Sequence, residues 1–86
     1  MGYKIIWHDK VLRDLEALDK KDAIKIVEKV KKYLVQNPIG LGTPLKGIFK
    51  GLFRYRYGMY RVIYAIDMAE EKIIVLHVKH RKEAYR

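Results

Sequence analysis

The sequence predicts an α+β fold, with two helices in the N-terminal half and a small sheet built around a β-hairpin in the C-terminal half. Two patterns favour this class. Apolar side chains recur at helical spacing through residues 11–34, whereas residues 52–79 form short apolar or alternating segments separated by turn residues. The length suits one domain, so we expect residues 1–86 to form a single unit around one small core.

The chain opens with a short predicted strand and an amphipathic helix. Residues 3–7 place Tyr3, Ile5 and Trp7 on one strand face, and Asp9 is a suitable N-cap for the helix that follows. The apolar positions of this helix are Val11, Leu12, Leu15 and Leu18. Its polar positions, which we expect to face solvent, are Arg13, Asp14, Glu16 and Asp19.

A second helix is predicted from about Asp22 to Asn37, because Pro38 disfavours a helical conformation at the residue before it. The link around residues 20–21 is too short for anything but neighbouring, roughly antiparallel helices. Glycine and proline then recur so often through residues 37–51 that we expect a loop. In that loop Leu45 and Phe49 are expected to pack on the core, which leaves Lys46 and Lys50 exposed near the hairpin.

The hairpin gathers fixed positive charge. Strand side chains alternate, so Arg54 and Arg56 share one face of the strand 52–57, and Phe53, Tyr55 and Tyr57 share the other. The dipeptide Gly58-Met59 fits a two-residue turn that requires glycine first. The returning strand, 60–66, then brings Arg61 to the same strand pair.

The last strand, residues 73–79, is apolar on both faces until His77 and Lys79 appear on one of them, so we expect it in the interior of the sheet. The sequence contains 19 Lys and Arg against 10 Asp and Glu, a formal charge of +9. Arginine and tyrosine on a strand are also typical of a merely solubilising face. The strong positive charge favours the alternative, a surface that binds polyphosphate and stacks on exposed bases.

Several chemistries are excluded by residue content. The chain has no cysteine and no serine, which excludes thiol and serine nucleophiles and thiolate metal sites. The three histidines lack ligand spacing, so we expect neither a metal nor a cofactor. No apolar run approaches the ~20 residues of a membrane-spanning helix. We therefore expect a cytoplasmic protein that does not bind a membrane.

Phosphoryl chemistry without a metal is compatible with the residues present. RNA carries its own nucleophile in the 2′-hydroxyl, so a protein can cleave it by positioning that group and stabilising the negative charge of the transition state. Arginine suits the second task, because its planar fork binds phosphate oxygens and stays charged. The predicted catalytic residues are Arg54, Arg56, Arg61, Arg81 and Tyr85. Residues expected to add RNA contacts are Lys46, Lys50, Lys79, His80 and Lys82.

The order of elements and four sequence blocks together resemble the RelE branch of the RelE/ParE superfamily of toxins. The blocks are Pro44–Gly47, Phe53–Gly58, Tyr60–Tyr64 and His80–Tyr85. The resemblance implies a twisted antiparallel sheet with the helical hairpin packed on one side. It further implies an endoribonuclease that enters the ribosomal A site, cuts mRNA and arrests translation, held inactive by a co-encoded antitoxin in a hetero-oligomeric complex. The family's active residues correspond to the five catalytic candidates given above.

One departure from the family concerns proton transfer. The best-known members carry lysines where this chain has Arg54 and Arg56, and arginine does not release its proton. Tyr85, His80 and His77 are the alternatives for a general base, beside a site that works by positioning and charge alone. Two other functions stay open: inhibition of DNA gyrase by protein binding, as in the ParE branch, and RNA binding without catalysis.

Overall fold

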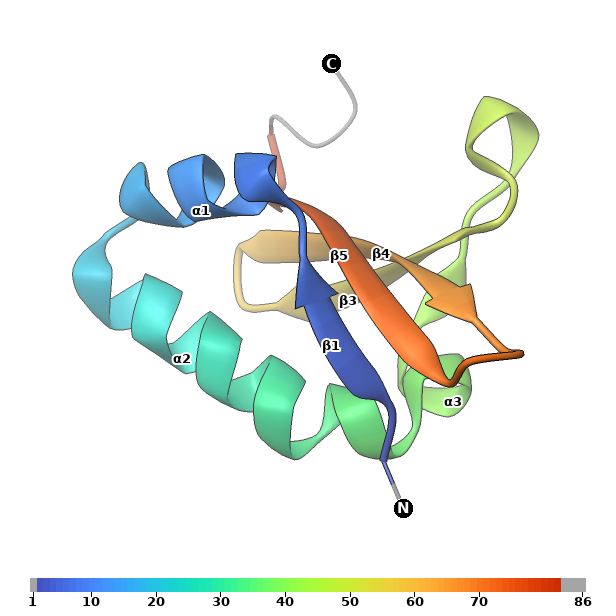
Figure 1. Cartoon of the computed structure of the whole chain (residues 1–86). Helices are drawn as coiled ribbons and strands as arrows, with labels where there is room; N and C mark the ends of the chain where they lie inside the picture. Colours follow the sequence, from blue (N-terminus) through green and yellow to red (C-terminus); the bar gives the residue numbers. More distant parts are fainter. Residues whose placement is uncertain (1, 83–86) are drawn as a thin grey trace.

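The computed structural model describes residues 2–82, which form a five-stranded sheet with helices on one side (Figure 1). The elements are β1 (Lys4–Trp7), α1 (Asp9–Glu16), α2 (Lys20–Lys32), the 3-10 helix η1 (Leu34–Gln36), α3 (Pro38–Leu41), β2 (Thr43–Pro44), the 3-10 helix η2 (Gly47–Phe49), β3 (Leu52–Tyr57), β4 (Tyr60–Asp67) and β5 (Lys72–His80). This arrangement confirms the predicted α+β class.

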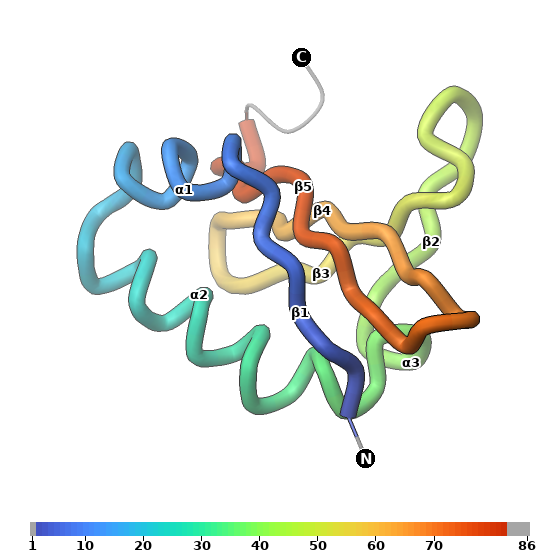
Figure 2. Tube along the Cα trace, in the orientation of Figure 1, coloured from blue at the N-terminus to red at the C-terminus, as the bar shows by residue number. Residues whose placement is uncertain are grey.

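The strands lie in the order β1-β5-β4-β3-β2, as the tube in Figure 2 also shows. Strands β2 to β5 pair antiparallel, as expected. The exception is β1, which runs parallel to β5 and pairs from Lys4 opposite Lys72 to Trp7 opposite Val75. Strand β5 therefore has a neighbour on each side, which is the interior position that its apolar sequence predicts.

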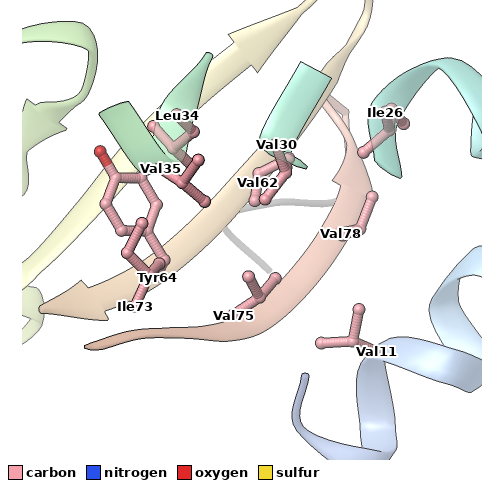
Figure 3. Packing of buried hydrophobic residues seen from close by; sticks show 10 residues of the cluster. All are labelled: Val11, Ile26, Val30, Leu34, Val35, Val62, Tyr64, Ile73, Val75 and Val78. Atoms are coloured by element: carbon pink, nitrogen blue, oxygen red, sulfur yellow. The ribbon is translucent and has the colours of Figure 1, made fainter. Parts of the chain in front are cut away.

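The core lies between the helices and one face of the sheet (Figure 3). Ile26 and Val30 of α2 pack toward this face, and Val62 and Val78 meet them from β4 and β5. The remaining buried members of the cluster are Val11, Leu34, Val35, Tyr64, Ile73 and Val75. Burial of these side chains, each favourable by roughly 1.5–3 kcal/mol, holds the helices against the sheet.

Helix α1 differs from expectation in which side it buries. His8, not Asp9, is the N-cap, and its Nδ1 accepts a 3.1 Å hydrogen bond from the Lys10 N–H. Asp14, expected to face solvent, is only 6% exposed, whereas Leu12, expected in the core, is 54% exposed. Helical spacing alone cannot predict this rotation, because a polar contact to β5, described below, draws the Asp14 side of the helix inward.

Helix α2 begins at Lys20, with Asp19 as its N-cap, and ends at Lys32 rather than at Asn37. The segment 37–51, expected to be a loop, contains the short elements α3, β2 and η2. The part that links β2 to β3, with η2, projects from the sheet (Figure 2). Leu45 is half-buried there. The expected packing of Phe49 on the core is wrong, since its side chain is 41% exposed. None of the helices in residues 2–82 is long and apolar enough to cross a membrane.

Candidate functional site

The β3–β4 hairpin closes through the two-residue turn that the sequence predicts. Tyr57 and Tyr60 are the last paired residues, and Gly58 has a φ of 56°. Met59 is not among the described residues with positive φ, so the turn is of the type with glycine first. This tight closure fixes the register of every pair along the hairpin.

The register places the hairpin arginines together. Arg56 pairs directly with Arg61, and Arg54 pairs with Ile63 one step further from the turn. Residues directly opposite in an antiparallel pair project from the same face. Arg54, Arg56 and Arg61 therefore share the face opposite to the one that carries Val62 and the helices.

A β-bulge in β5 adds two more residues to this face. Tyr64 pairs with Val75, but the next residue of β4, Ile63, pairs with His77, so Leu76 is the extra residue. Before the bulge Val75 points into the core, and after it the core residue is Val78. With strict alternation His77 would share the face of Val75, but the bulge turns it to the arginine face.

The result is two parallel rows of side chains across β3, β4 and β5. One row is Arg56, Arg61 and Lys79, and the other is Arg54, Ile63 and His77. Neighbouring strands lie about 5 Å apart and the two rows about 7 Å apart. Ile63 is 6% exposed but lies outside the core cluster, which is consistent with cover from the basic side chains around it. We refer to Arg54, Arg56, Arg61, His77 and Lys79 as the basic face.

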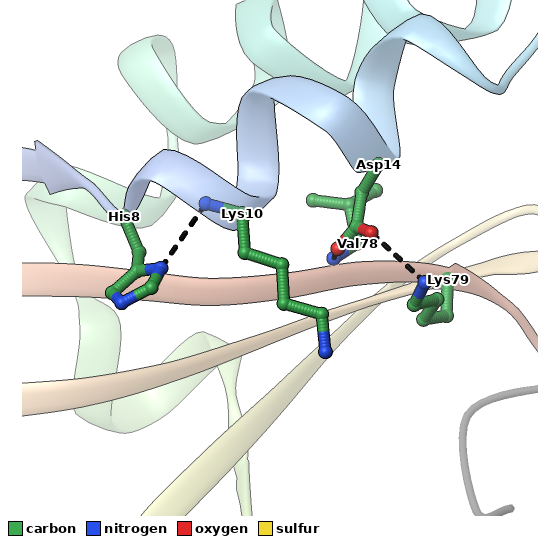
Figure 4. Close-up of polar contacts among 5 residues, drawn as sticks. All are labelled: His8, Lys10, Asp14, Val78 and Lys79. Atoms are coloured by element: carbon green, nitrogen blue, oxygen red, sulfur yellow. Dashed lines mark hydrogen bonds and ion pairs between the residues drawn. The ribbon is translucent and has the colours of Figure 1, made fainter.

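An ion pair fixes the Lys79 side chain at the edge of this face (Figure 4). Its Nζ lies 2.8 Å from Oδ1 of the buried Asp14, and the other carboxylate oxygen accepts a 3.1 Å hydrogen bond from the Val78 N–H. Strand β1 ends opposite Val75, so α1 occupies the edge of β5 beyond that point. Asp14 thus takes the place of a strand partner and offsets part of the charge of Lys79.

A hollow of about 330 Å³ lies beside the two hairpin arginines on β3. It is lined by Leu41, Thr43, Arg54, Tyr55 and Arg56. The hollow exists because β2 pairs with only two residues of β3, Phe53 and Arg54. Three consecutive residues of β3, Arg54, Tyr55 and Arg56, thus border a space outside the sheet edge.

The last residue of β5 and the residues that follow it lie at the turn end of the sheet. The Arg81 N–H donates a 2.7 Å hydrogen bond to the Met59 carbonyl, which holds Arg81 beside the hairpin turn. His80 lies against Tyr60 on the helix side, with ring centroids 5.6 Å apart, and its Nδ1 accepts a 3.3 Å bond from the Lys82 N–H. The structure therefore brings Arg81, but not His80, toward the arginines.

The other predicted residues lie further away or outside the described chain. Lys46 and Lys50 are exposed, as expected, but they flank η2 at the start of β3, at the opposite end from the Gly58 turn. Lys82 is exposed after β5. Tyr85 lies outside residues 2–82, so its predicted role stays a prediction.

His77 is the imidazole of the basic face. Burial lowers its pKa below the ordinary 6.5, and the positive charge of Lys10 lowers it further, against a smaller opposite effect of Asp14. The imidazole is therefore neutral at pH 7. The positions of His77 and Asp14 at this site could not be predicted from local sequence patterns. They depend on the bulge and on the α1–β5 contact, which such patterns do not encode.

Known proteins are similar to this chain in both sequence and fold. The family model described as "ParE toxin of type II toxin-antitoxin system" matches residues 5–85. The chain belongs to this toxin family. Toxin RelE of Mycobacterium tuberculosis is 42% identical over 74 residues, which cover 86% of this chain and 76% of that protein. Toxin RelG of the same organism is 33% identical over 86 residues, with coverage of 100% and 99%.

The solved toxin–antitoxin complex RelBE2 of M. tuberculosis contains a chain with the same fold. It superposes with a TM-score of 0.90 at 31% identity and covers 94% of this chain and 100% of its own. The protein is thus a RelE-like toxin of a toxin–antitoxin system. This agrees with the resemblance inferred from the hairpin and the C-terminal sequence blocks.

Proposed function

We propose that this RelE-like toxin is an endoribonuclease that cleaves mRNA in the ribosomal A site and thereby arrests translation. In this reaction the ribosome presents the message, and the toxin supplies positive charge around one phosphate. Because ribosomes and message are its targets, we place its action in the cytoplasm.

The observation that carries this proposal is the register of the hairpin. Arg56 and Arg61 are direct partners, and Arg54 lies one row away on the same face. Three guanidinium groups within this area match the several oxygens of an internucleotide phosphate, which gains negative charge in the transition state. Arg81, held beside the turn, adds a fourth cation at the same end.

The remaining features of the site suit a nucleotide chain. The hollow bordered by Tyr55 is placed to receive a base or sugar next to the phosphate that the arginines hold. Lys46 and Lys50, at the far end of β3, extend positive charge away from the reacting phosphate. We therefore assign Lys46, Lys50 and Lys82 to backbone contacts, which position RNA without chemistry. Tyr85 is proposed to stack on a base.

The partner that silences the toxin is proposed to be a co-encoded antitoxin. The M. tuberculosis RelBE2 structure, in which the similar chain occurs, is a toxin–antitoxin complex. We propose that this toxin forms a hetero-oligomer of the same kind. Covering the basic face with acidic residues would remove the charge on which cleavage depends.

A reconstituted translation reaction with a defined message tests the proposal. Purified toxin should produce cuts within the A-site codon, mapped by primer extension, with a cyclic phosphate on the upstream fragment. Arg61→Ala should lower the single-turnover rate by about 100-fold or more, in line with removal of one donor to the transition state. Arg13→Ala, an exposed arginine on α1, is the matched control and should cut at the wild-type rate. Intact message at saturating wild-type toxin would contradict the proposal.

Inhibition of DNA gyrase is the second candidate, because the matching family model is that of the ParE toxin. The RelE and RelG relatives at 42% and 33% identity favour the nuclease. A supercoiling reaction with purified gyrase separates the two candidates. Stalled supercoiling together with intact message would support the second candidate, whereas cut message with normal supercoiling supports the first.

A further inference from the structure

The basic face lacks an obvious proton acceptor among its cations. The guanidinium groups of Arg54, Arg56 and Arg61 keep their protons at any pH compatible with folding. The Lys79 ammonium forms an ion pair with Asp14, with 2.8 Å between Nζ and Oδ1. The fifth member of the face, His77, carries a ring nitrogen that can accept a proton.

The register places His77 where a proton acceptor is needed. It lies in the same row as Arg54 and Ile63. Arg61 lies on the neighbouring strand β4, in the other row. With strands about 5 Å apart and rows about 7 Å apart, the Cα atoms of His77 and Arg61 are separated by roughly 8 Å. A phosphate bound by Arg61 would therefore lie close to His77.

The other two histidines are placed differently. The Nδ1 atom of His8 accepts the Lys10 N–H at the start of α1, and His80 packs against Tyr60 on the helix side of the sheet. The bulge at Leu76 decides which of the two β5 histidines lies on the basic face. Without it, strict alternation would turn His77 into the core and place His80 on the basic face instead.

The surroundings of His77 favour its neutral form. From α1 and its cap it faces Lys10, Asp14 and His8, and within β5 it faces Lys79. Arg61 of β4 and Arg54 of β3 add positive charge from across the sheet. Burial lowers the pKa of His77 most, and Lys10 and Lys79 act in the same direction, while Asp14 opposes them. Below this lowered pKa the ring becomes protonated and loses its capacity as a base.

We propose that His77 is the general base of the cleavage reaction and takes the proton of the ribose 2′-hydroxyl. This inference rests on the nuclease function proposed above. The 2′-oxygen forms a bond to phosphorus as its proton passes to the imidazole, and the bond from phosphorus to the 5′-oxygen breaks. The leaving 5′-oxygen takes a proton from water, and the imidazolium returns its own to solvent. The products are a 2′,3′-cyclic phosphate and a 5′-hydroxyl, with no net oxidation and no cofactor.

The pH dependence of single-turnover cleavage tests this assignment on the same ribosome-bound message. For wild-type toxin the logarithm of the rate should rise with pH with a slope near one below the His77 pKa, which lies under 6.5, and then level off. His77→Gln should lower the plateau by about 100-fold to 10,000-fold and remove the acid limb. Its affinity for a short RNA should stay within about threefold of wild type, because the arginines bind the phosphate. His80→Gln, on the other face of the sheet, tests the alternative histidine base and should keep the acid limb.

Chemical rescue provides a second, independent readout. Free imidazole added to His77→Ala should restore part of the cleavage rate, with an acid limb that follows the pKa of imidazole. It should leave Arg61→Ala unchanged, since that variant lacks charge and not a base. Rescue distinguishes a proton acceptor from a residue that merely packs on Ile63. If His77 only packed on Ile63, the cleavage rate of His77→Ala would not follow the protonation of the added imidazole.

The outcomes separate this inference from the function on which it rests. Wild-type cleavage with a rate and pH profile that His77→Gln leaves unchanged overturns the role of His77 and leaves the nuclease intact. A slower variant that keeps the acid limb and is not rescued also overturns it. Failure of the wild type to cut any message overturns the nuclease function itself. Should His77→Gln not fold, the wild-type profile decides, since the absence of an acid limb down to the lowest pH at which the toxin stays folded excludes a histidine base.

Discussion

The buried carboxylate of Asp14 accepts a 3.1 Å hydrogen bond from the backbone N–H of Val78. This contact joins α1 to the edge of β5 at the place where β1 has already ended. Because the same carboxylate pairs with Lys79, a residue remote from the hairpin helps to shape the basic face. The helix and the sheet are thus connected through a polar contact as well as through the core.

The contact predicts that Asp14→Ala destabilises the fold. Removal of the carboxylate leaves the buried Val78 N–H without its acceptor and Lys79 without its partner, which together should lower the free energy of unfolding by about 2 to 3 kcal/mol. Urea denaturation at neutral pH measures this as a lower midpoint with an unchanged slope. Glu16→Ala, an exposed acid on the same helix, is the control and should change the free energy by less than about 0.5 kcal/mol. Equal midpoints for the two variants would show that the contact contributes nothing.

Tight packing around Tyr64 predicts coupling between two positions. The Tyr64 hydroxyl donates a 2.6 Å hydrogen bond to the Pro38 carbonyl, and a Cβ added at Gly42 would overlap that hydroxyl. Gly42→Ala should therefore lower the free energy of unfolding by about 1 to 3 kcal/mol. The same change should be less harmful in a Tyr64→Phe background, where the overlapping oxygen is absent. A double-mutant cycle from urea titrations should give a coupling above about 0.5 kcal/mol, and strict additivity would contradict this account.

The position of Arg56 predicts a change in the salt dependence of RNA binding. If Arg56 neutralises one phosphate, Arg56→Ala should reduce the slope of log K against log salt by about 0.7 for a single-stranded RNA. Fluorescence anisotropy across a range of salt concentrations measures this slope. Lys25→Ala removes an exposed charge from α2, on the other side of the sheet, and should leave the slope unchanged. Equal slopes for both variants would place RNA binding away from the basic face.

The hairpin illustrates how much of the candidate site is local information. The alternation of residues 52–57 and the glycine-first turn at Gly58 suffice to put Arg54 and Arg56 on one face and to bring Arg61 back opposite them. Each of these features depends on neighbours within ten residues. A pattern of this range is visible in a sequence, and the structure confirms it.

The parts that were predicted wrongly involve contacts between distant segments. Asp14 was expected in solvent because helical spacing gives only the relative directions of side chains and not what each side meets. Phe49 was expected in the core because it is large and apolar. It lies instead in η2, on the segment that projects between β2 and β3, and its side chain is exposed. In both cases the exposure of the side chain depends on how other elements pack around it, which the local sequence does not determine.

By itself, the sequence determined the α+β class, the hairpin with its arginines and the likeness to RelE toxins, since periodicity, turn chemistry and short sequence blocks are properties of the chain alone. Only the tertiary structure decided that β1 lies parallel to β5, that Asp14 caps the free edge beyond it, and that His77 joins the arginines. The physical reason is that all three features depend on contacts between segments far apart in the chain. For His77 the contact is the β4–β5 pair, where the bulge at Leu76 shifts the pairing by one residue and reverses which side chains face the core.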